Sequence, residues 1–221
     1  MADLQLTHLY RAPLGPNPGK PPLLVLLHGV GSNERDLFSL AGELDPRYAV
    51  VSVRAPHQRF PGSYAWFEVQ MGGGTFVIDP EMEEHSRGLL TAFLPEAAEV
   101  YGADLARIHL AGFSQGAIMS MGIMLTRPDL VAAVVAMSGR ILPEVLPLAR
   151  PVEELAGFPI LVVHGTHDAV IPVSYGRDAR EILSKLPVDL TYEEFPMGHE
   201  VSGASLRVVA DWLTARLDTS P

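Results

Sequence analysis

The sequence predicts an α/β fold in which helices cover both faces of a mostly parallel central sheet. Short apolar segments of strand length alternate along the chain with longer segments of helical period. The segment 23–27 is continuously apolar, which is typical of a parallel strand buried on both faces. The chain has 221 residues, of which 48% are hydrophobic, enough for one substantial core. We therefore expect a single domain spanning 1–221.

The expected elements follow one another without an internal repeat. The first expected strand, 4–10, alternates and is predicted to pair antiparallel at an edge of the sheet. The other strands are expected at 23–27, 48–53, 108–111, 131–137, 160–163 and 190–194, and the helices at 34–44, 80–101, 114–126, 173–186 and 202–217. The segment 58–74 is expected to be a long irregular excursion. The segment 138–159 has room for about one helix and two loops, too little for a separate cap domain.

The composition excludes several classes of partner. Acidic residues outnumber basic ones by 26 to 16, which gives a formal charge of −10 and disfavours nucleic acid and anionic membrane surfaces. There is no cysteine, so thiolate catalysis and disulfides are impossible. The first residues do not resemble a signal peptide, and no apolar run is long enough to span a bilayer. We expect a soluble cytoplasmic protein without stable membrane insertion.

The motif most informative about chemistry is Gly-Phe-Ser-Gln-Gly at 112–116, between an expected strand and an expected helix. This context is typical of a nucleophile elbow, a tight turn that exposes a strained serine. Glycines are needed on both sides because side chains there would collide with the neighbouring strand and helix. The bare pattern is also compatible with a serine that caps a helix. Its context predicts that Ser114 is a nucleophile.

Two further residues complete a candidate catalytic triad. Asp168 follows the expected strand 160–163, at the carboxyl edge of the sheet, where ligands bind in open α/β sheets. His199 lies in a glycine-containing loop before the last expected helix. The order Ser114, Asp168, His199 is the order used on one hydrolase fold and differs from the orders of other serine-protease folds. We expect His199 to act as base and Asp168 to orient it.

The turn after the strand 23–27 reads His-Gly-Val-Gly and predicts an oxyanion hole. The backbone N–H of Val30 and that of Gln115, at the start of a helix, are placed to bind a developing oxyanion. His28 is interpreted as a residue that holds this loop in shape. His164, His167 and Asp168 are clustered in sequence, but strand alternation is expected to turn His164 away, so we predict neither a metal site nor a cofactor.

With these parts in place, the chain resembles the phospholipase/carboxylesterase family, which includes the acyl-protein thioesterases. The resemblance rests on His-Gly-Val-Gly at 28–31, Trp66-Phe67, Gly-Phe-Ser-Gln-Gly at 112–116, His-Gly-Thr-His-Asp at 164–168 and Met-Gly-His at 197–199. It implies the α/β-hydrolase fold without a large lid, an oxyanion hole from Val30 and Gln115, and Trp66 beside the acyl pocket. The chain departs from the family pattern at Ala117, at Glu68 and in the glycine-rich segment 70–76.

The expected function is a serine carboxylesterase that acts on short to medium acyl chains. The alternatives are an acyl-(protein) thioesterase or a lysophospholipase-like activity at the same site, and a catalytically silent binding protein that kept the pocket. Met71 and Phe76 are candidates for the wall of an apolar acyl pocket, although such residues equally serve as ordinary packing. The sequence leaves open the natural acyl and leaving groups, the preference for ester or thioester, and the oligomeric state.

Overall fold

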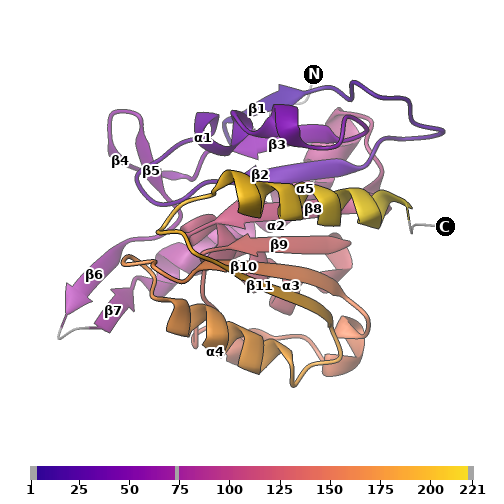
Figure 1. The fold of residues 1–221 in the computed structure, drawn as a ribbon. Helices are drawn as coiled ribbons and strands as arrows, with labels where there is room; N and C mark the ends of the chain where they lie inside the picture. The colour runs from indigo at the N-terminus through magenta and orange to yellow at the C-terminus, as the bar shows by residue number, and fades with distance from the viewer. Residues whose placement is uncertain (1–3, 73–74, 219–221) are drawn as a thin grey trace.

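Seven strands form one sheet in the order β1-β3-β2-β8-β9-β10-β11 (Figure 1). A computed structural model describes residues 4–72 and 75–218, and it leaves the side chains at 70–76 undescribed. The strands are β1 His8–Arg11, β2 Leu23–Leu27, β3 Ala49–Val53, β8 Ile108–Phe113, β9 Ala133–Met137, β10 Pro159–Gly165 and β11 Asp189–Phe195. Only β1 runs antiparallel to its neighbour, as its alternating sequence predicted, and the other pairs are parallel. The α/β class is confirmed.

Helices cover both faces of this sheet (Figure 1). Helices α1 Arg35–Phe38 and α5 Gly203–Asp218 pack on one face, and α2 Pro80–Val100, α3 Gln115–Thr126 and α4 Val173–Leu183 pack on the other. Alternating strand residues serve the two cores, so Val50 packs with the α5 side and Val51 with the α3 side. Every residue of α3 is buried, which places this helix at the centre of the larger core.

Three expectations about local structure were wrong. The segment expected to be irregular contains two hairpins, β4 His57–Phe60 with β5 Ser63–Ala65 and β6 Val69–Gly72 with β7 Thr75–Ile78. The expected helix 34–44 is reduced to α1 and the short 3₁₀ helix η1 Ala41–Glu43. The segment 138–159 holds only the 3₁₀ helices η4 Leu146–Leu148 and η5 Val152–Leu155. Prolines at 143, 147 and 151 explain this last difference, because proline removes the N–H that a longer helix needs.

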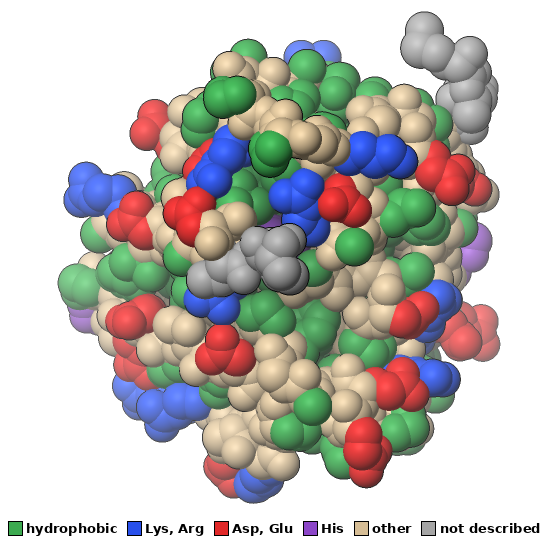
Figure 2. Space-filling model, turned by 90° about the vertical axis from the view of Figure 1, so that its right-hand side faces the viewer, with side chains coloured by type: hydrophobic (Ala, Val, Ile, Leu, Met, Phe, Trp, Pro, Cys, Tyr) green, Lys and Arg blue, Asp and Glu red, His purple; other side chains and the backbone are tan. Residues whose placement is uncertain are grey.

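The end of the molecule that carries the amino ends of the parallel strands has a mixed charge pattern. Figure 2 shows basic and acidic side chains interspersed on this face. Arg47 there bonds both Asp45 and Asp218, at 2.8 and 2.7 Å. The described side chains therefore form no uniformly basic surface on the face drawn. Within residues 4–72 and 75–218, no helix is long and apolar enough to cross a membrane.

A buried histidine in β8 predicts an acid-sensitive step in stability. His109 is 2% exposed, its Nδ1 lies 2.6 Å from the Tyr48 hydroxyl, and burial lowers its pKa from 6.5 to about 4. Below pH 6.5 the unfolded chain therefore binds a proton at His109, whereas the folded chain binds it only near pH 4. The free energy of unfolding is unaffected by this difference above pH 6.5, and it falls by about 3 kcal/mol as the pH falls toward 4. In His109→Gln, urea unfolding should lose this part of the pH dependence, and an unchanged pH dependence would contradict it.

Candidate active site

Four loops meet at the carboxyl edge of the parallel strands. Ser114 directly follows β8, Asp168 lies just beyond β10, His199 lies in the loop after β11, and Val30 follows β2. Because the sheet order places β8, β9 and β10 side by side, loops that are far apart in sequence become neighbours. The hairpins β4–β5 and β6–β7 extend from this same end (Figure 1). This is the edge at which open α/β sheets bind ligands.

Ser114 occupies a strained turn between β8 and α3. Its φ of 55° and ψ of −118° lie in a region that non-glycine residues rarely adopt. A Cβ at Gly116 would collide with the Leu27 carbonyl, and a Cβ at Gly112 would collide with the backbone of Gly116. The two glycines therefore allow β2, β8 and α3 to approach closely enough to hold the turn. Ser114 makes no side-chain cap to α3, which leaves its hydroxyl for another partner.

The three residues expected to form a triad are brought together in one line of hydrogen bonds. The Oγ of Ser114 lies 2.9 Å from Nε2 of His199, and Nδ1 of His199 lies 2.7 Å from Oδ2 of Asp168. The other carboxylate oxygen of Asp168 accepts the backbone N–H groups of Val170 and Ile171, at 2.9 and 2.8 Å. When Nδ1–H of His199 donates its hydrogen bond to Asp168, Nε2 carries no proton and can accept the proton of Ser114.

The loop after β2 is held by His28. Its Nδ1 donates to the Gly29 carbonyl at 2.7 Å, and its Nε2 accepts the Ala55 N–H at 3.0 Å. Burial lowers the pKa of His28, in keeping with the neutral ring that these two bonds require. The Trp66 indole N–H donates to the His28 carbonyl at 2.9 Å. These contacts agree with the interpretation of His28 as a residue that shapes the loop carrying Val30.

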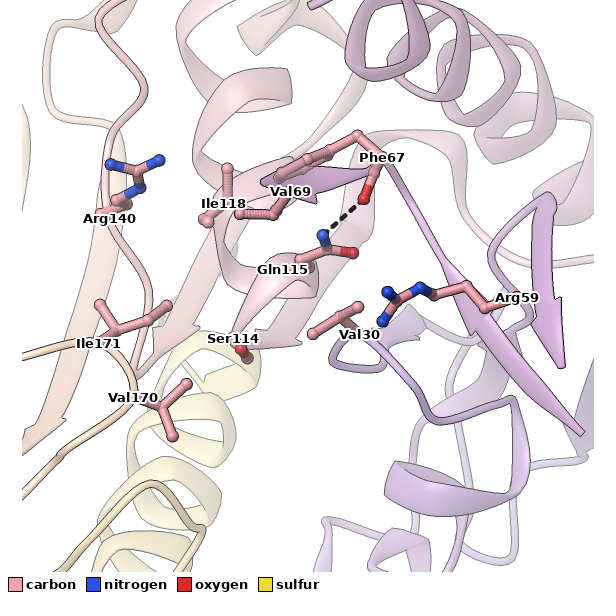
Figure 3. A pocket seen from close by; sticks show the side chains of 10 residues that line it. All are labelled: Val30, Arg59, Phe67, Val69, Ser114, Gln115, Ile118, Arg140, Val170 and Ile171. Carbon is pink, nitrogen blue, oxygen red and sulfur yellow. Dashed lines mark hydrogen bonds between the residues drawn. The ribbon is translucent and has the colours of Figure 1, made fainter. Parts of the chain in front are cut away.

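Gln115 contributes both its backbone and its side chain. The first helical bond of α3 runs from the Ile118 N–H to the Ser114 carbonyl, so the Gln115 N–H lies at the unbonded, positive end of the helix. The side-chain Oε1 accepts the Trp66 N–H at 3.0 Å, and Nε2 donates to the Phe67 carbonyl at 2.8 Å. The side chain therefore ties α3 to the segment 66–67 (Figure 3).

Gln115→Leu is expected to destabilise the fold although it keeps the backbone N–H. The substitution leaves the Trp66 N–H and the Phe67 carbonyl buried without these partners, at a cost of about 1–3 kcal/mol for each group. We expect a lower free energy of unfolding in urea. Ser120→Ala, which removes only a hydroxyl bonded to its own helix, is the matched control in α3 and should change stability far less. Equal stability of the two variants would contradict a stabilising role for the hydrogen bonds between the Gln115 side chain and the segment 66–67.

A cavity of about 160 Å³ opens beside Ser114 (Figure 3). Its walls are mostly apolar and come from both hairpin regions, from α3 and from the loops after β9 and β10: Val30, Arg59, Phe67, Val69, Ser114, Gln115, Ile118, Arg140, Val170 and Ile171. Trp66, expected beside the acyl pocket, is fully buried beneath the loop at 28–30 and does not line this cavity. Met71 and Phe76 face each other in the β6–β7 register, but their side chains lie outside the described residues.

Most of these wall residues were missed by sequence reasoning. Val170 and Ile171 directly follow Asp168, and Ile118 lies in the first turn after Ser114, so their position beside the triad residues was an available signal. Arg59 and Arg140 carried no comparable signal. Among the described residues, no three histidine, aspartate, glutamate or cysteine side chains lie together as metal ligands.

Comparison with known proteins places the chain among hydrolases. The family model for phospholipases and carboxylesterases matches residues 16–217. Esterase YpfH of Escherichia coli (strain K12) is 30% identical over 213 residues, which cover 89% of this chain and 84% of that protein. Acyl-protein thioesterase 1 of Neurospora crassa is 26% identical over 238 residues, covering 90% of this chain and 92% of that protein.

Solved structures show the same architecture over nearly the whole chain. The crystal structure of esterase PE8 has a TM-score of 0.80 and 28% sequence identity, and covers 95% of this chain and 98% of its own. A carboxylesterase from Mesorhizobium loti, at 24% identity, has a TM-score of 0.81 over 97% of both chains and supports the fold alone. The fold is that of the α/β-hydrolases without a large cap, and the chain belongs to the phospholipase/carboxylesterase family.

Proposed function

We propose that this hydrolase cleaves carboxylic esters with Ser114 as nucleophile, His199 as general base and Asp168 as the residue that orients His199. The observation that carries the proposal is the line of two hydrogen bonds, 2.9 and 2.7 Å long, from Ser114 through His199 to Asp168. Both distances lie in the range that direct proton transfer requires. The family relationship supports the same chemistry.

The first half of the reaction forms an acyl-enzyme. His199 takes the Ser114 proton at Nε2 while Oγ attacks the acyl carbonyl, and the negative charge moves to the carbonyl oxygen. The backbone N–H groups of Val30 and Gln115, two residues of the cavity wall, would bind this oxyanion. Asp168 stabilises the imidazolium. The proton on Nε2 then passes to the leaving alcohol as the carbon–oxygen bond breaks.

The second half repeats this path with water. His199 removes a proton from water, the resulting nucleophile attacks the acyl-enzyme, and the proton returns to Ser114 Oγ as the carboxylic acid leaves. The same steps apply to a thioester with a thiol as leaving group. The Neurospora crassa relative named as a thioesterase makes this the second candidate substrate class.

The cavity size limits the acyl group. A cavity of roughly 150 Å³ in another protein holds one benzene molecule, and the cavity beside Ser114 is about 160 Å³. We therefore expect an optimum at acyl chains of about four to six carbons, since a group of roughly benzene size fills such a space. Longer chains must extend past the apolar wall into solvent and gain little from the additional carbons.

The test is a series of p-nitrophenyl esters with two to twelve acyl carbons, together with the matching thioesters. We expect kcat/KM to peak at short acyl chains and a fluorophosphonate to label Ser114. A steady rise of kcat/KM toward long chains would contradict the size argument alone. Absence of both turnover and labelling would favour the alternative of a silent binding protein.

A further inference from the structure

The cavity beside Ser114 carries a charge opposite to that of the chain. Among its described lining residues, the polar side chains other than Ser114 and Gln115 are Arg59 and Arg140, and none of these residues is acidic. The whole chain has a formal charge of −10. Two guanidinium groups at the wall of one small cavity therefore form a local positive site in an acidic protein, an arrangement that attracts anions.

The two arginines lie at opposite ends of the cavity. Figure 3 shows Arg140 beside Ile118 and Ile171 on one side, and Arg59 beside Val30 on the other, with Ser114 between the two ends. An acyl chain bound at Ser114 along Ile118 and Ile171 would run over an apolar wall and end at a guanidinium. An apolar wall that ends at a positive charge matches a short hydrocarbon chain with a terminal anion.

The two arginines differ in their neighbours and in their place along the cavity. The Arg59 Nε lies 3.2 Å from Oε1 of Glu68, so a carboxylate offsets part of its charge. The Arg140 guanidinium lies over the Tyr175 ring, 5.3 Å from the centroid, and the ring face orients it. Arg140 also lies at the end of the apolar wall formed by Ile118 and Ile171, where the far end of an acyl chain would arrive. Its position therefore makes Arg140 the anchor for a terminal anion.

We propose that the preferred substrates are monoesters of short dicarboxylic acids, with the free carboxylate of the acyl group held by Arg140. The planar guanidinium presents paired N–H donors that match the two oxygens of a carboxylate. Arg59 adds a weaker attraction at the other end. This inference rests on the proposed acyl transfer at Ser114 and names the substrate class for it.

The test compares mono-p-nitrophenyl adipate with p-nitrophenyl hexanoate, which have six acyl carbons each and differ in the terminal carboxylate. We expect the wild type to favour the adipate at least tenfold in kcat/KM, and Arg140→Gln to lower that ratio about tenfold, the effect of one charge-assisted hydrogen bond. Arg59→Gln should lower it less. Added salt should also reduce the preference.

Arg150→Gln is the matched control, because Arg150 is an exposed arginine that pairs with Glu154 and does not line the cavity. It should leave the ratio unchanged. A wild type that prefers hexanoate, or a ratio that Arg140→Gln does not change, would overturn the inference. Hexanoate turnover without a preference leaves the proposed function intact, whereas no turnover of either ester and no labelling of Ser114 would count against that function itself.

A second inference comes from a buried histidine on the far side of Asp168. His164, in β10, is fully buried, and its Nε2 lies 2.8 Å from the Ile171 carbonyl and 3.5 Å from Oδ2 of Asp168. A carbonyl only accepts, so Nε2 carries the proton and donates it to the Ile171 carbonyl, with Oδ2 of Asp168 close beside this N–H. Strand alternation was expected to turn His164 away from Asp168, and that expectation was wrong.

The geometry assigns His164 as a positioning residue for Asp168, in support of the proposed triad. Its N–H joins the two ends of the turn 168–171, in which Oδ1 of Asp168 already accepts two backbone N–H groups. The backbone of Gly176 in α4 packs directly against the imidazole, which prevents the ring from moving away. Oδ2 of Asp168 thus meets His199 on one side and His164 on the other.

The test compares His164→Gln, whose amide reaches the same position and keeps a donor, with His164→Leu, which lacks one. We expect His164→Leu to lower kcat about tenfold with KM unchanged, because the turn that carries Asp168 loses its hydrogen bond to β10 and the N–H beside Oδ2. The acid limb of its kcat/KM profile should move to lower pH, because a turned carboxylate stabilises the imidazolium less. His164→Gln should recover most of both properties.

His109→Leu is the control for burial, since His109 is as deeply buried in β8 but contacts Tyr48. It should reduce stability without shifting the acid limb. If His164→Leu does not fold, His164→Met, a donor-free side chain of similar length, replaces it. An unshifted acid limb in the donor-free variant, or equal losses in the Gln and donor-free variants, would overturn the assignment.

Discussion

Ser114→Ala should lower kcat toward p-nitrophenyl esters by about 10⁶-fold, the loss seen when the nucleophile of another serine triad is removed. The Oγ of Ser114 is the atom that lies 2.9 Å from Nε2 of His199, and no other described hydroxyl is bonded to that nitrogen. Without it, water alone can attack the acyl carbonyl. The variant should bind substrate and should not be labelled by a fluorophosphonate.

Ser138→Ala is the matched control for this substitution. Ser138 directly follows the neighbouring strand β9, is fully buried, and has a φ of 51° against 55° for Ser114. The two variants therefore remove a hydroxyl from similarly strained backbone. Ser138→Ala should keep most of the activity, and neither variant should lower the melting temperature appreciably, because a strained catalytic residue contributes little to stability. A comparable loss of rate in both variants would refute the assignment of Ser114.

The three candidate triad residues could be expected at one place in the fold for a physical reason. Each of Ser114, Asp168 and His199 follows a strand, and all parallel strands end at the same edge of the sheet. Knowledge of the strands therefore brings the three side chains to one place without any knowledge of the path of the loops. The glycines at 112 and 116 add a local steric requirement that is visible in the sequence.

The walls of the cavity could not be predicted in this way. Arg59 and Arg140 lie on segments without long periodic patterns, and their arrival at the cavity depends on hairpin pairing and on proline-interrupted turns. Family resemblance predicts Trp66 beside the acyl pocket; its indole donates to the His28 carbonyl, and the neighbouring Phe67 lines the cavity. Side-chain direction within a loop is set by tertiary contacts, so motif matching finds this segment but not which of its side chains reaches the cavity.

Asp168→Asn should lower kcat by about 10⁴-fold at neutral pH, the loss reported for the same substitution in another triad. The two backbone N–H groups of Val170 and Ile171 point at Oδ1 of Asp168, so the amide oxygen must stay on that side. The amide NH₂ is then turned toward Nδ1 of His199, where Oδ2 accepted the Nδ1–H hydrogen bond before. His199 must move its proton to Nε2, and Nε2 can no longer accept the proton of Ser114.

This argument predicts the tautomer as well as the rate. In ¹⁵N spectra, the proton of neutral His199 should move from Nδ1 in the wild type to Nε2 in Asp168→Asn. Asp79 provides the matched control, because its Oδ1 also accepts two backbone N–H groups, those of Glu81 and Met82, and no described histidine is hydrogen-bonded to its carboxylate. Asp79→Asn should keep the His199 tautomer and the rate. If Asp168→Asn lost its activity with the proton still on Nδ1, Asp168 would act through its charge and not through the tautomer of His199.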